Sequence, residues 1–318
     1  MDASDGMQVV PPEGGAVREL LRVGGGVVEL GAVDPRSTPG LPAVAGRGSA
    51  RKAWARQQVE LIGAGLGRQQ EMLFAGAQAA TGPQAPTSAP TSGGTELGRG
   101  RPQRVLLVLQ AMDCGGKDGT IKRVAGAMNP LGLHIRSFGP PTRQERRHDF
   151  LWRIRREVPP PGYVGIFNRS HYEDVLIARV ESLVPEATWR TRYDKINAFE
   201  RELTDAGVRL VKVMLHISHA EQGERLLERL TDPTKYWKYN PSDLDSRARW
   251  DDYQAAYAEA LSRCGTDAAP WHVVPADRKW YRDWAVAHLL RETFDELDLG
   301  YPPAGFDVAA ERGRLCGD

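Results

Sequence analysis

Five short apolar runs stand at intervals along the last two-thirds of the chain, and polar or turn residues bound each of them. They cover residues 105–110, 134–138, 163–167, 210–217 and 271–275. Apolar runs of this length are typical of strands that are buried on both faces of a sheet. Between the runs, helical patterns cover residues 120–128, 142–157, 189–206, 220–230, 242–264 and 279–298. Strands that alternate with helices predict an α/β fold with a five-stranded parallel sheet covered on both faces.

The first third of the chain lacks this alternation. Residues 1–26 are rich in glycine and polar residues and predict a mostly disordered tail. Residues 27–40 predict an extended arm with turns at Asp34-Pro35 and Pro39-Gly40. The next segment, 50–75, predicts a helix whose apolar face is formed by Trp54, Val59, Ile62, Leu66 and Leu73.

These patterns divide the chain into five parts. Proline, serine, threonine and glycine dominate residues 81–103, which contain almost no large apolar residue and predict a flexible insertion. We therefore expect a tail at 1–26, an arm and a helix packed on the core at 27–80, that insertion, a catalytic domain at 104–303 and a C-terminal tail at 304–318.

The stretch from residue 105 to residue 123 reads VLLVLQAMDCGGKDGTIKR and joins the first strand to the first helix of the sheet. A strand, a glycine-rich turn and a helix in that order are the context of a phosphate-binding loop. Gly115, Gly116 and Gly119 would let the backbone approach a phosphate. The helix that includes Thr120 would aim unpaired N–H groups at it. Lys117 adds a mobile positive charge.

The strict pattern G-x-x-x-x-G-K-[ST] fails twice here, because Ala111 replaces the first glycine and Asp118 replaces the Ser or Thr. Asp118 could bind Mg²⁺ through its carboxylate, and Asp113 places a second acid in the loop. Two carboxylates beside a phosphate repel it unless cations intervene, so the loop predicts a Mg²⁺ site. The alternative is an ordinary strand-to-helix turn with a solvated lysine and solvated acids.

Two further segments predict contacts with a ligand. Polar residues follow the third strand, and ligands of open α/β sheets bind beyond the carboxyl ends of the strands. Arg169 would clamp a phosphate there, and Asn168 or Glu173 would hold water or metal. Residues 231–240 form an aromatic and basic loop between two helices, typical of a lid. The alternative for this loop is an interhelical turn whose aromatic residues pack on the body. Ser242 is expected to cap the helix that follows.

Composition excludes several classes of protein but does not identify the function. The chain has 318 residues and a formal net charge of +1, so local clusters would have to attract any polyanion. Its three cysteines, Cys114, Cys264 and Cys316, are too few and too scattered for a disulfide framework or a zinc site. No apolar run approaches a membrane-spanning length, and no signal peptide is evident, so a cytoplasmic protein is expected.

Ten motifs in order resemble the polyphosphate kinase 2 family. They are LQAMDCGGKDGTIKRV, NPLG, HDFLWRI, IFNRSHYEDVLIARV, INAFERELTDAGV, KVMLHIS, LTDPTKYWKYNPSDL, RWDDYQAAY, APWHVVPADRKW and LGYPP. The resemblance runs from about residue 27 to residue 303. It implies a P-loop kinase-like three-layer α/β/α fold with a helical lid at about 230–245. It also implies Mg²⁺-dependent transfer of the terminal phosphoryl group of inorganic polyphosphate to AMP, ADP or both.

The resemblance also assigns roles to residues. It places Asp113, Lys117 and Arg169 in catalysis, and Asp113 and Asp118 at Mg²⁺, or at Mn²⁺ in its place. Lys122, Arg123, Lys235 and Lys238 would line a track for polyphosphate. The family further implies a homo-oligomer, a dimer or tetramer, with no nucleic-acid or membrane partner. Two alternatives remain open from the residues alone: an ATP-dependent nucleoside monophosphate kinase on the same fold, and a polyanion-binding module without catalysis.

Overall fold

A computed structural model describes residues 8–81 and 103–317 of the chain. Its centre is a five-stranded sheet in the order β2-β3-β1-β4-β5, and every neighbouring pair is parallel. The strands are β1 (Arg104–Ala111), β2 (Leu133–Ser137), β3 (Val164–Asn168), β4 (Val208–His216) and β5 (Trp271–Pro275). From β1 the chain adds β2 and β3 on one side of β1, and it then adds β4 and β5 on the other side. The order therefore reverses at β1, and the crevice where ligands bind in such sheets opens at its carboxyl end.

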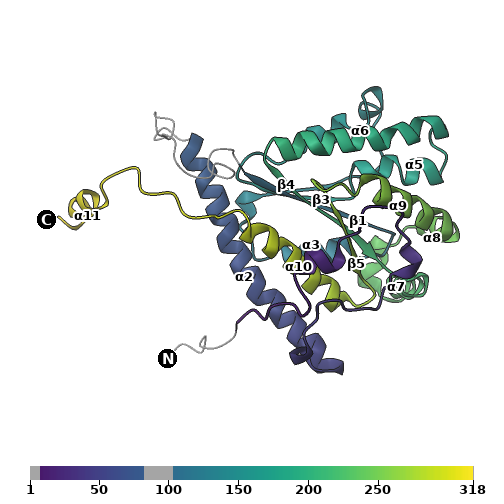
Figure 1. Ribbon diagram of the computed structural model, residues 1–318, viewed down its shortest axis with the longest axis horizontal. Helices are drawn as coiled ribbons and strands as arrows, with labels where there is room; N and C mark the ends of the chain where they lie inside the picture. The colour runs from purple at the N-terminus through teal and green to yellow at the C-terminus, as the bar shows by residue number, and fades with distance from the viewer. Residues whose placement is uncertain (1–7, 82–102, 318) are drawn as a thin grey trace.

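Helices cover both faces of this sheet (Figure 1). Along β1 the side chains alternate, so that Val105 and Leu107 face one core cluster and Leu106 and Val108 face the other. The first cluster is closed by α2 (Gly48–Thr81), α3 (Lys117–Val124) and α10 (Lys279–Asp295). The second is closed by α4 (Trp152–Arg155), α5 (Ile177–Val180), α6 (Glu186–Asp205) and α9 (Trp250–Cys264). The predicted three-layer α/β/α architecture is confirmed.

The remaining elements are short or lie around the rim. They are α1 (Val17–Leu21), α7 (His219–Thr231), α8 (Ser242–Ala248), α11 (Val308–Cys316) and 3₁₀ turns at Leu30–Ala32, Ala43–Ala45, Pro130–Gly132, Glu145–Arg147, His171–Asp174 (η5) and Pro233–Lys238 (η6). After α10 the chain passes α2, where the Tyr301 hydroxyl donates to Glu71 Oε2 at 2.7 Å. Helix α11 then projects away from the body (Figure 1). No helix of the described residues is long and apolar enough to cross a membrane. All three cysteines are free.

The expectation of a disordered N-terminal tail is wrong for residues 8–26. Val17 and Leu21 are buried in the first core cluster, because α1 packs on α10. Glu292 of α10 accepts from the backbone N–H groups of Val17 and Arg18, at 2.8 and 2.9 Å, and so pairs two donors that the start of α1 would leave unsatisfied. Residues 1–7, and residues 82–102 of the insertion, lie outside the described part of the chain. The arm at 27–40 has the expected turns.

Two of the predicted elements have a different character. The segment 142–157 is mostly irregular, with only the turn Glu145–Arg147 and the single turn of α4. Thr142 and Glu145 bond to each other's backbone N–H, and such local bonds compete with a continuous helix. Strand β2 is not buried as expected, since it pairs only with β3 at the sheet edge and Ile135 is 48% exposed.

Several predicted helices have different bounds, and three of them differ for local reasons. Helix α3 begins at Lys117, directly after the glycine turn, and ends at Val124, two residues before Gly126. The helix expected over 242–264 is broken at Arg249, whose backbone leaves the helical region, into α8 and α9. Ser242 does not cap α8; its own N–H instead bonds to Asn240 Oδ1 at 3.2 Å. The last helix ends at Asp295, three residues early, and Asp298 beyond it has a positive φ of 48°.

A buried histidine in β5 makes the stability of this fold depend on pH. Burial lowers the pKa of His272 to about 4, whereas an unfolded chain would titrate at about 6.5. The unfolded state therefore binds more protons between these values. The contribution of His272 to the free energy of unfolding is therefore fully present above pH 6.5 and is lost as the pH falls toward 4.

We expect His272→Gln to flatten this dependence, since an amide can still donate to the Lys212 carbonyl that the ring contacts at 3.1 Å. The free energy of unfolding of the native chain should fall by about 2–3 kcal/mol more than that of the variant between pH 7 and pH 4.5. Chemical denaturation at several pH values measures the difference. The exposed His148→Gln serves as control. Equal slopes for His272→Gln and the native chain would mean that folding does not shift the pKa of His272.

Candidate active site

The loop between β1 and α3 has a backbone that depends on its glycines. Cys114 and Gly116 both adopt positive φ, at 63° and 101°. A Cβ on Gly116 would lie 1.8 Å from Arg282 Nη1, and one on Gly115 would lie 2.3 Å from Ala111 Cβ. The loop is therefore packed tightly from two sides, and α3 starts at its end with the N–H groups of its first turn directed to the loop.

A cavity of about 480 Å³ opens over this loop at the carboxyl ends of β1 and β3. Most of the residues predicted from the sequence line it together: Asp113, Gly115, Gly116, Lys117, Asp118, Gly119, Asn168, Arg169, Lys235 and Lys238. The same cavity is lined by residues that sequence analysis missed: Arg225, Glu228, Arg229, Asn240, Asp243, Lys279 and Arg282. The cavity is thus rich in cations but also holds several carboxylates, which suits a phosphate bound together with metal.

Lys117 is not the mobile charge that the sequence led us to expect. It is buried, and its Nζ donates to the carbonyl of Ala111 at 2.9 Å. Burial, followed by the charge of Arg169, lowers the pKa of Lys117 to about 8. A phosphate that entered the cavity would oppose both effects, because it would supply the negative charge that this ammonium lacks.

Two polar contacts cross the cavity from the β1 loop to the residues after β3. Arg169 Nη2 contacts Asp113 Oδ1 at 2.8 Å, and Asn168 Nδ2 donates to Asp118 Oδ1 at 2.7 Å. Glu173 lies 3.5 Å from Arg169 Nη1, and the charges of Glu173 and Asp113 raise the pKa of Arg169 against the effect of burial. Asp113 and Asp118, the two acids predicted to hold metal, therefore each have a polar partner at the site.

Arginines from α7 and α10 pack against the loop and also line the cavity. Arg225 donates to the carbonyls of Cys114 and Ala276, at 2.8 and 2.6 Å, and Gln222 Nε2 donates to the carbonyl of Asp113 at 3.1 Å. Arg282 is buried beside Asp283. No signal in the sequence identified these residues, because they are far from the loop along the chain and belong to ordinary-looking charged helices.

The predicted lid is the turn η6 between α7 and α8. Asp232 accepts from the N–H of Thr234 at 3.0 Å, and Lys235 pairs with Glu228 at 2.7 Å. Trp237 is 77% exposed and Tyr236 is more than half exposed. Tyr236 and Trp237 therefore do not pack on the body as a packed interhelical turn would require, whereas Tyr239 is partly buried. Lys235 and Lys238 of this segment line the cavity.

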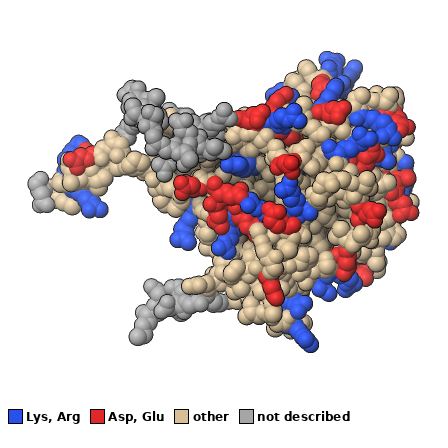
Figure 2. All heavy atoms as spheres, viewed as in Figure 1, with Lys and Arg blue, Asp and Glu red and all other residues tan. Residues whose placement is uncertain are grey.

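The other predicted residues lie around the cavity rather than in it. Lys122 and Arg123 line a second hollow of about 810 Å³ between α2, α3 and α10, which shares Gly119, Lys279 and Arg282 with the first. Thr120 is buried, and its hydroxyl donates to the Gly116 carbonyl at 3.2 Å. Both charge signs are interspersed over the face of the molecule shown in Figure 2, so that face carries no continuous basic surface.

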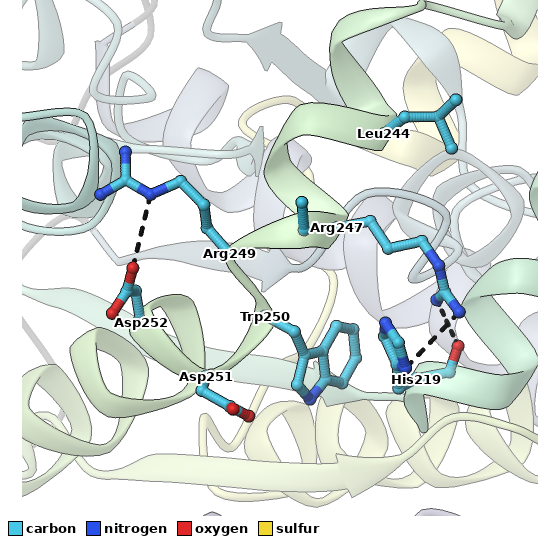
Figure 3. Close-up of a pocket in the computed structure, with 8 residues that line it drawn as sticks. His219, Leu244, Arg247, Arg249, Trp250, Asp251 and Asp252 are labelled. Atoms are coloured by element: carbon cyan, nitrogen blue, oxygen red, sulfur yellow. Dashed lines mark hydrogen bonds and ion pairs between the residues drawn. The ribbon is translucent and has the colours of Figure 1, made fainter.

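A third hollow of about 730 Å³ lies between the start of α7 and the α8–α9 junction (Figure 3). It contains none of the predicted residues. The ring of Trp250 lies beside that of His219, with ring centres 5.0 Å apart. Arg247 donates to the His219 carbonyl and reaches Gln222 Oε1 at 3.2 Å. Through Gln222 this hollow is connected to the loop of the first cavity.

The carboxylates of the first cavity can be tested as metal ligands by their chemistry. Among the described residues no group of three or more His, Cys, Asp or Glu side chains could hold an ion by itself. Mg²⁺ does not require such a group, since it usually binds one or two carboxylates and completes its shell with water and substrate phosphates. Asp113 and Asp118 fit that requirement, and Asp118 is exposed to the cavity.

Comparison with known proteins identifies a family whose members resemble this chain. Residues 96–299 match the family described as Polyphosphate kinase 2 (PPK2). The chain is similar to an AMP/ADP-polyphosphate phosphotransferase of Meiothermus ruber, with 52% identity over 199 residues, 63% of this chain and 74% of the relative. It is also similar to an ADP-polyphosphate phosphotransferase of Rhodopseudomonas palustris, with 43% identity over 210 residues, 62% and 73%. A crystal structure of polyphosphate kinase 2 from Arthrobacter aurescens TC1 superposes with a TM-score of 0.84 and 45% identity, over 96% of this chain and 98% of that one.

The close approach of Arg282 to the loop generates a prediction about Gly116. Gly116→Ala should lower the free energy of unfolding by about 1–3 kcal/mol, because the positive φ is strained for alanine and the new methyl group meets the guanidinium. Thermal unfolding measures the change. Gly65→Ala in α2 is the matched control: nothing lies within 4 Å of its Cβ position, so it should instead stabilise by about 0.5–1 kcal/mol. Unchanged stability of Gly116→Ala would contradict the described loop.

Proposed function

This chain belongs to the polyphosphate kinase 2 family, and from that premise we propose that it transfers the terminal phosphoryl group of inorganic polyphosphate to AMP, ADP or both. The observation that carries the proposal is the meeting of Lys117, Asp113 and Arg169 in one cavity over the glycine loop. Phosphoryl transfer needs positioning and neutralisation of charge more than covalent chemistry, and these groups provide both. The name of the Meiothermus ruber relative supports AMP and ADP as acceptors.

We propose that the chain's own groups act in distinct ways. Lys117 and Arg169 would neutralise charge on the transferred phosphoryl group, and the N–H groups of the loop and of the start of α3 would orient its oxygens. Asp113 and Asp118 would hold Mg²⁺, or Mn²⁺ in its place, which would supply further positive charge between donor and acceptor phosphates. Asn168 orients Asp118, and Glu173 helps to orient Arg169.

The donor polymer needs a longer path than one cavity. The first and second hollows adjoin at Gly119, Lys279 and Arg282. A basic track can therefore run from Lys235 and Lys238 of the lid, past these shared residues, to Lys122 and Arg123. Binding along such a track should weaken with salt, because it releases counterions from the polymer. The family resemblance also predicts a homo-oligomer in the cytoplasm without a nucleic-acid partner, and these stay predictions.

The decisive assay offers the purified chain long-chain polyphosphate and Mg²⁺, without ATP, and adds AMP, ADP, GMP and GDP in turn. We expect ADP from AMP, ATP from ADP, or both, detected by chromatography of the nucleotides. In a parallel reaction ATP replaces polyphosphate, and phosphorylation of AMP in that reaction alone would indicate the nucleoside monophosphate kinase instead. Binding of polyphosphate with no transfer to any nucleotide would indicate the polyanion-binding module.

The two carboxylates of the loop generate a prediction in which rate and affinity move in opposite directions. Asp113→Asn and Asp118→Asn should each lower the transfer rate by roughly 10²-fold, the cost of removing one group that stabilises the transition state. Each variant also removes a negative charge that repels the polymer, so polyphosphate affinity without Mg²⁺ should stay level or rise.

The controls for these variants separate three explanations. Asp194→Asn, an exposed acid on α6, should change neither rate nor affinity. If activity and melting temperature fall together in the loop variants, the acids serve mainly as helix caps, whose loss costs about 1 kcal/mol. Wild-type turnover in both variants at saturating Mg²⁺ would show that the metal assignment is wrong.

A further inference from the structure

A lysine and a glutamate lie fully inside the protein on the side of the sheet away from the loop. Lys212 of β4 is 0% exposed and Glu200 of α6 is 1% exposed, with Nζ and Oε2 2.6 Å apart. Lys212 also donates to the Cys264 carbonyl at 2.7 Å. A buried ion pair costs desolvation, and apolar residues of similar size often stabilise a core as well or better. Its presence therefore calls for a purpose other than stability.

The remaining side-chain hydrogen bonds of this pair lead to one short segment. Lys212 Nζ donates to the Tyr172 hydroxyl at 2.9 Å, and that hydroxyl donates to Glu200 Oε1 at 2.8 Å. His171 Nε2 lies 3.2 Å from the same carboxylate oxygen. Tyr172 and His171 belong to the turn η5, which directly follows the residues at the end of β3. The side chains of Lys212 and Glu200 thus hold this turn through hydrogen bonds to Tyr172 and His171.

The segment fixed in this way carries a strained residue of the proposed active site. Arg169 has a φ of 64°, in the left-handed region that an arginine seldom adopts. Such a conformation persists only where the surroundings determine it. On one side the N–H of Arg169 bonds to the Leu109 carbonyl at 3.0 Å. On the other side the chain enters η5 within two residues.

We propose that Lys212, Glu200 and Tyr172 are positioning residues that hold Arg169 in this conformation, with its guanidinium beside Asp113 in the cavity. The inference rests on the proposed function, because it gives these residues a role only through Arg169. None of the three lines the cavity, so they cannot contact the substrates directly. If the anchor is lost, Arg169 can relax and its side chain spends less time at the transferred phosphoryl group.

Tyr172→Phe is the variant that tests this role. Changes at Lys212 or Glu200 would leave a buried charge unpaired and would risk unfolding the chain. Phenylalanine retains the ring, which packs edge-on against Trp271 at 4.7 Å, and removes only the hydroxyl. We expect kcat for polyphosphate-dependent transfer to fall about tenfold, with little change in KM for the nucleotide.

The matched control is Tyr281→Phe. Tyr281 is also fully buried, and its hydroxyl donates to the Pro39 carbonyl at 2.8 Å, away from the cavity. Its loss should lower the melting temperature to a similar extent without changing kcat. A tenfold loss in both variants would overturn the positioning role, since it would show that any lost buried hydroxyl reduces activity.

A double-mutant cycle with Arg169→Ala then separates positioning from general damage. If Tyr172 acts through Arg169, Tyr172→Phe should not lower kcat further in the Arg169→Ala background, while the losses in melting temperature should add. A full tenfold further loss in that background would overturn the inference. If Arg169→Ala keeps wild-type turnover, the inference falls while polyphosphate-dependent transfer stands. A native chain that shows no such transfer would overturn the proposed function and the inference together.

Discussion

The contact between Arg169 and Asp113 is the constraint on which the rest of the site depends. It joins the ends of two neighbouring strands, β1 and β3, at the point where the strand order of the sheet reverses. Arg225 and Arg282 pack against the glycine loop, and hydrogen bonds to Lys212 and Glu200 hold the turn η5 that follows β3. Each loop is therefore held by its own packing, and the ion pair joins the two. A phosphate held there would find its partners already in place, which lowers the cost of organising charge during transfer.

The pattern of apolar residues was sufficient to predict the layers of this fold, because its sheet is parallel and mostly buried. The strand at 271–275 has the same bounds in the structure, and β1, β3 and β4 differ by one or two residues. Local chemistry was less reliable at helix ends. Thr142 and Glu145 close a turn on themselves where the arginine-rich pattern indicated a helix, and Arg249 interrupts a pattern that reads continuously. The first of these outcomes depends on side-chain bonds to nearby backbone, which the spacing of apolar residues does not reveal.

The residues of the candidate site that could be predicted are those that lie close together in the sequence. The loop residues and Asn168-Arg169 come together because both follow strands whose carboxyl ends meet. Arg225, Arg229 and Arg282 were not predictable, since their place depends on how α7 and α10 pack over the loop. The N-terminal segment was misjudged for a similar reason. Its composition is that of a disordered tail, yet Val17 and Leu21 find apolar partners on α10, near the other end of the chain.

The bond between Val17 N–H and Glu292 has a consequence for the way the chain folds, because it spans 275 residues. The first core cluster needs α1 and α2 from the start of the chain and α10 from near its end. During synthesis on the ribosome, one apolar face of β1 and the buried side of α2 must therefore wait for almost the whole polypeptide. Contacts so distant in sequence slow folding and leave apolar surface open to aggregation in the meantime. The apolar faces of β1 and α2 therefore stay uncovered until α10 has emerged.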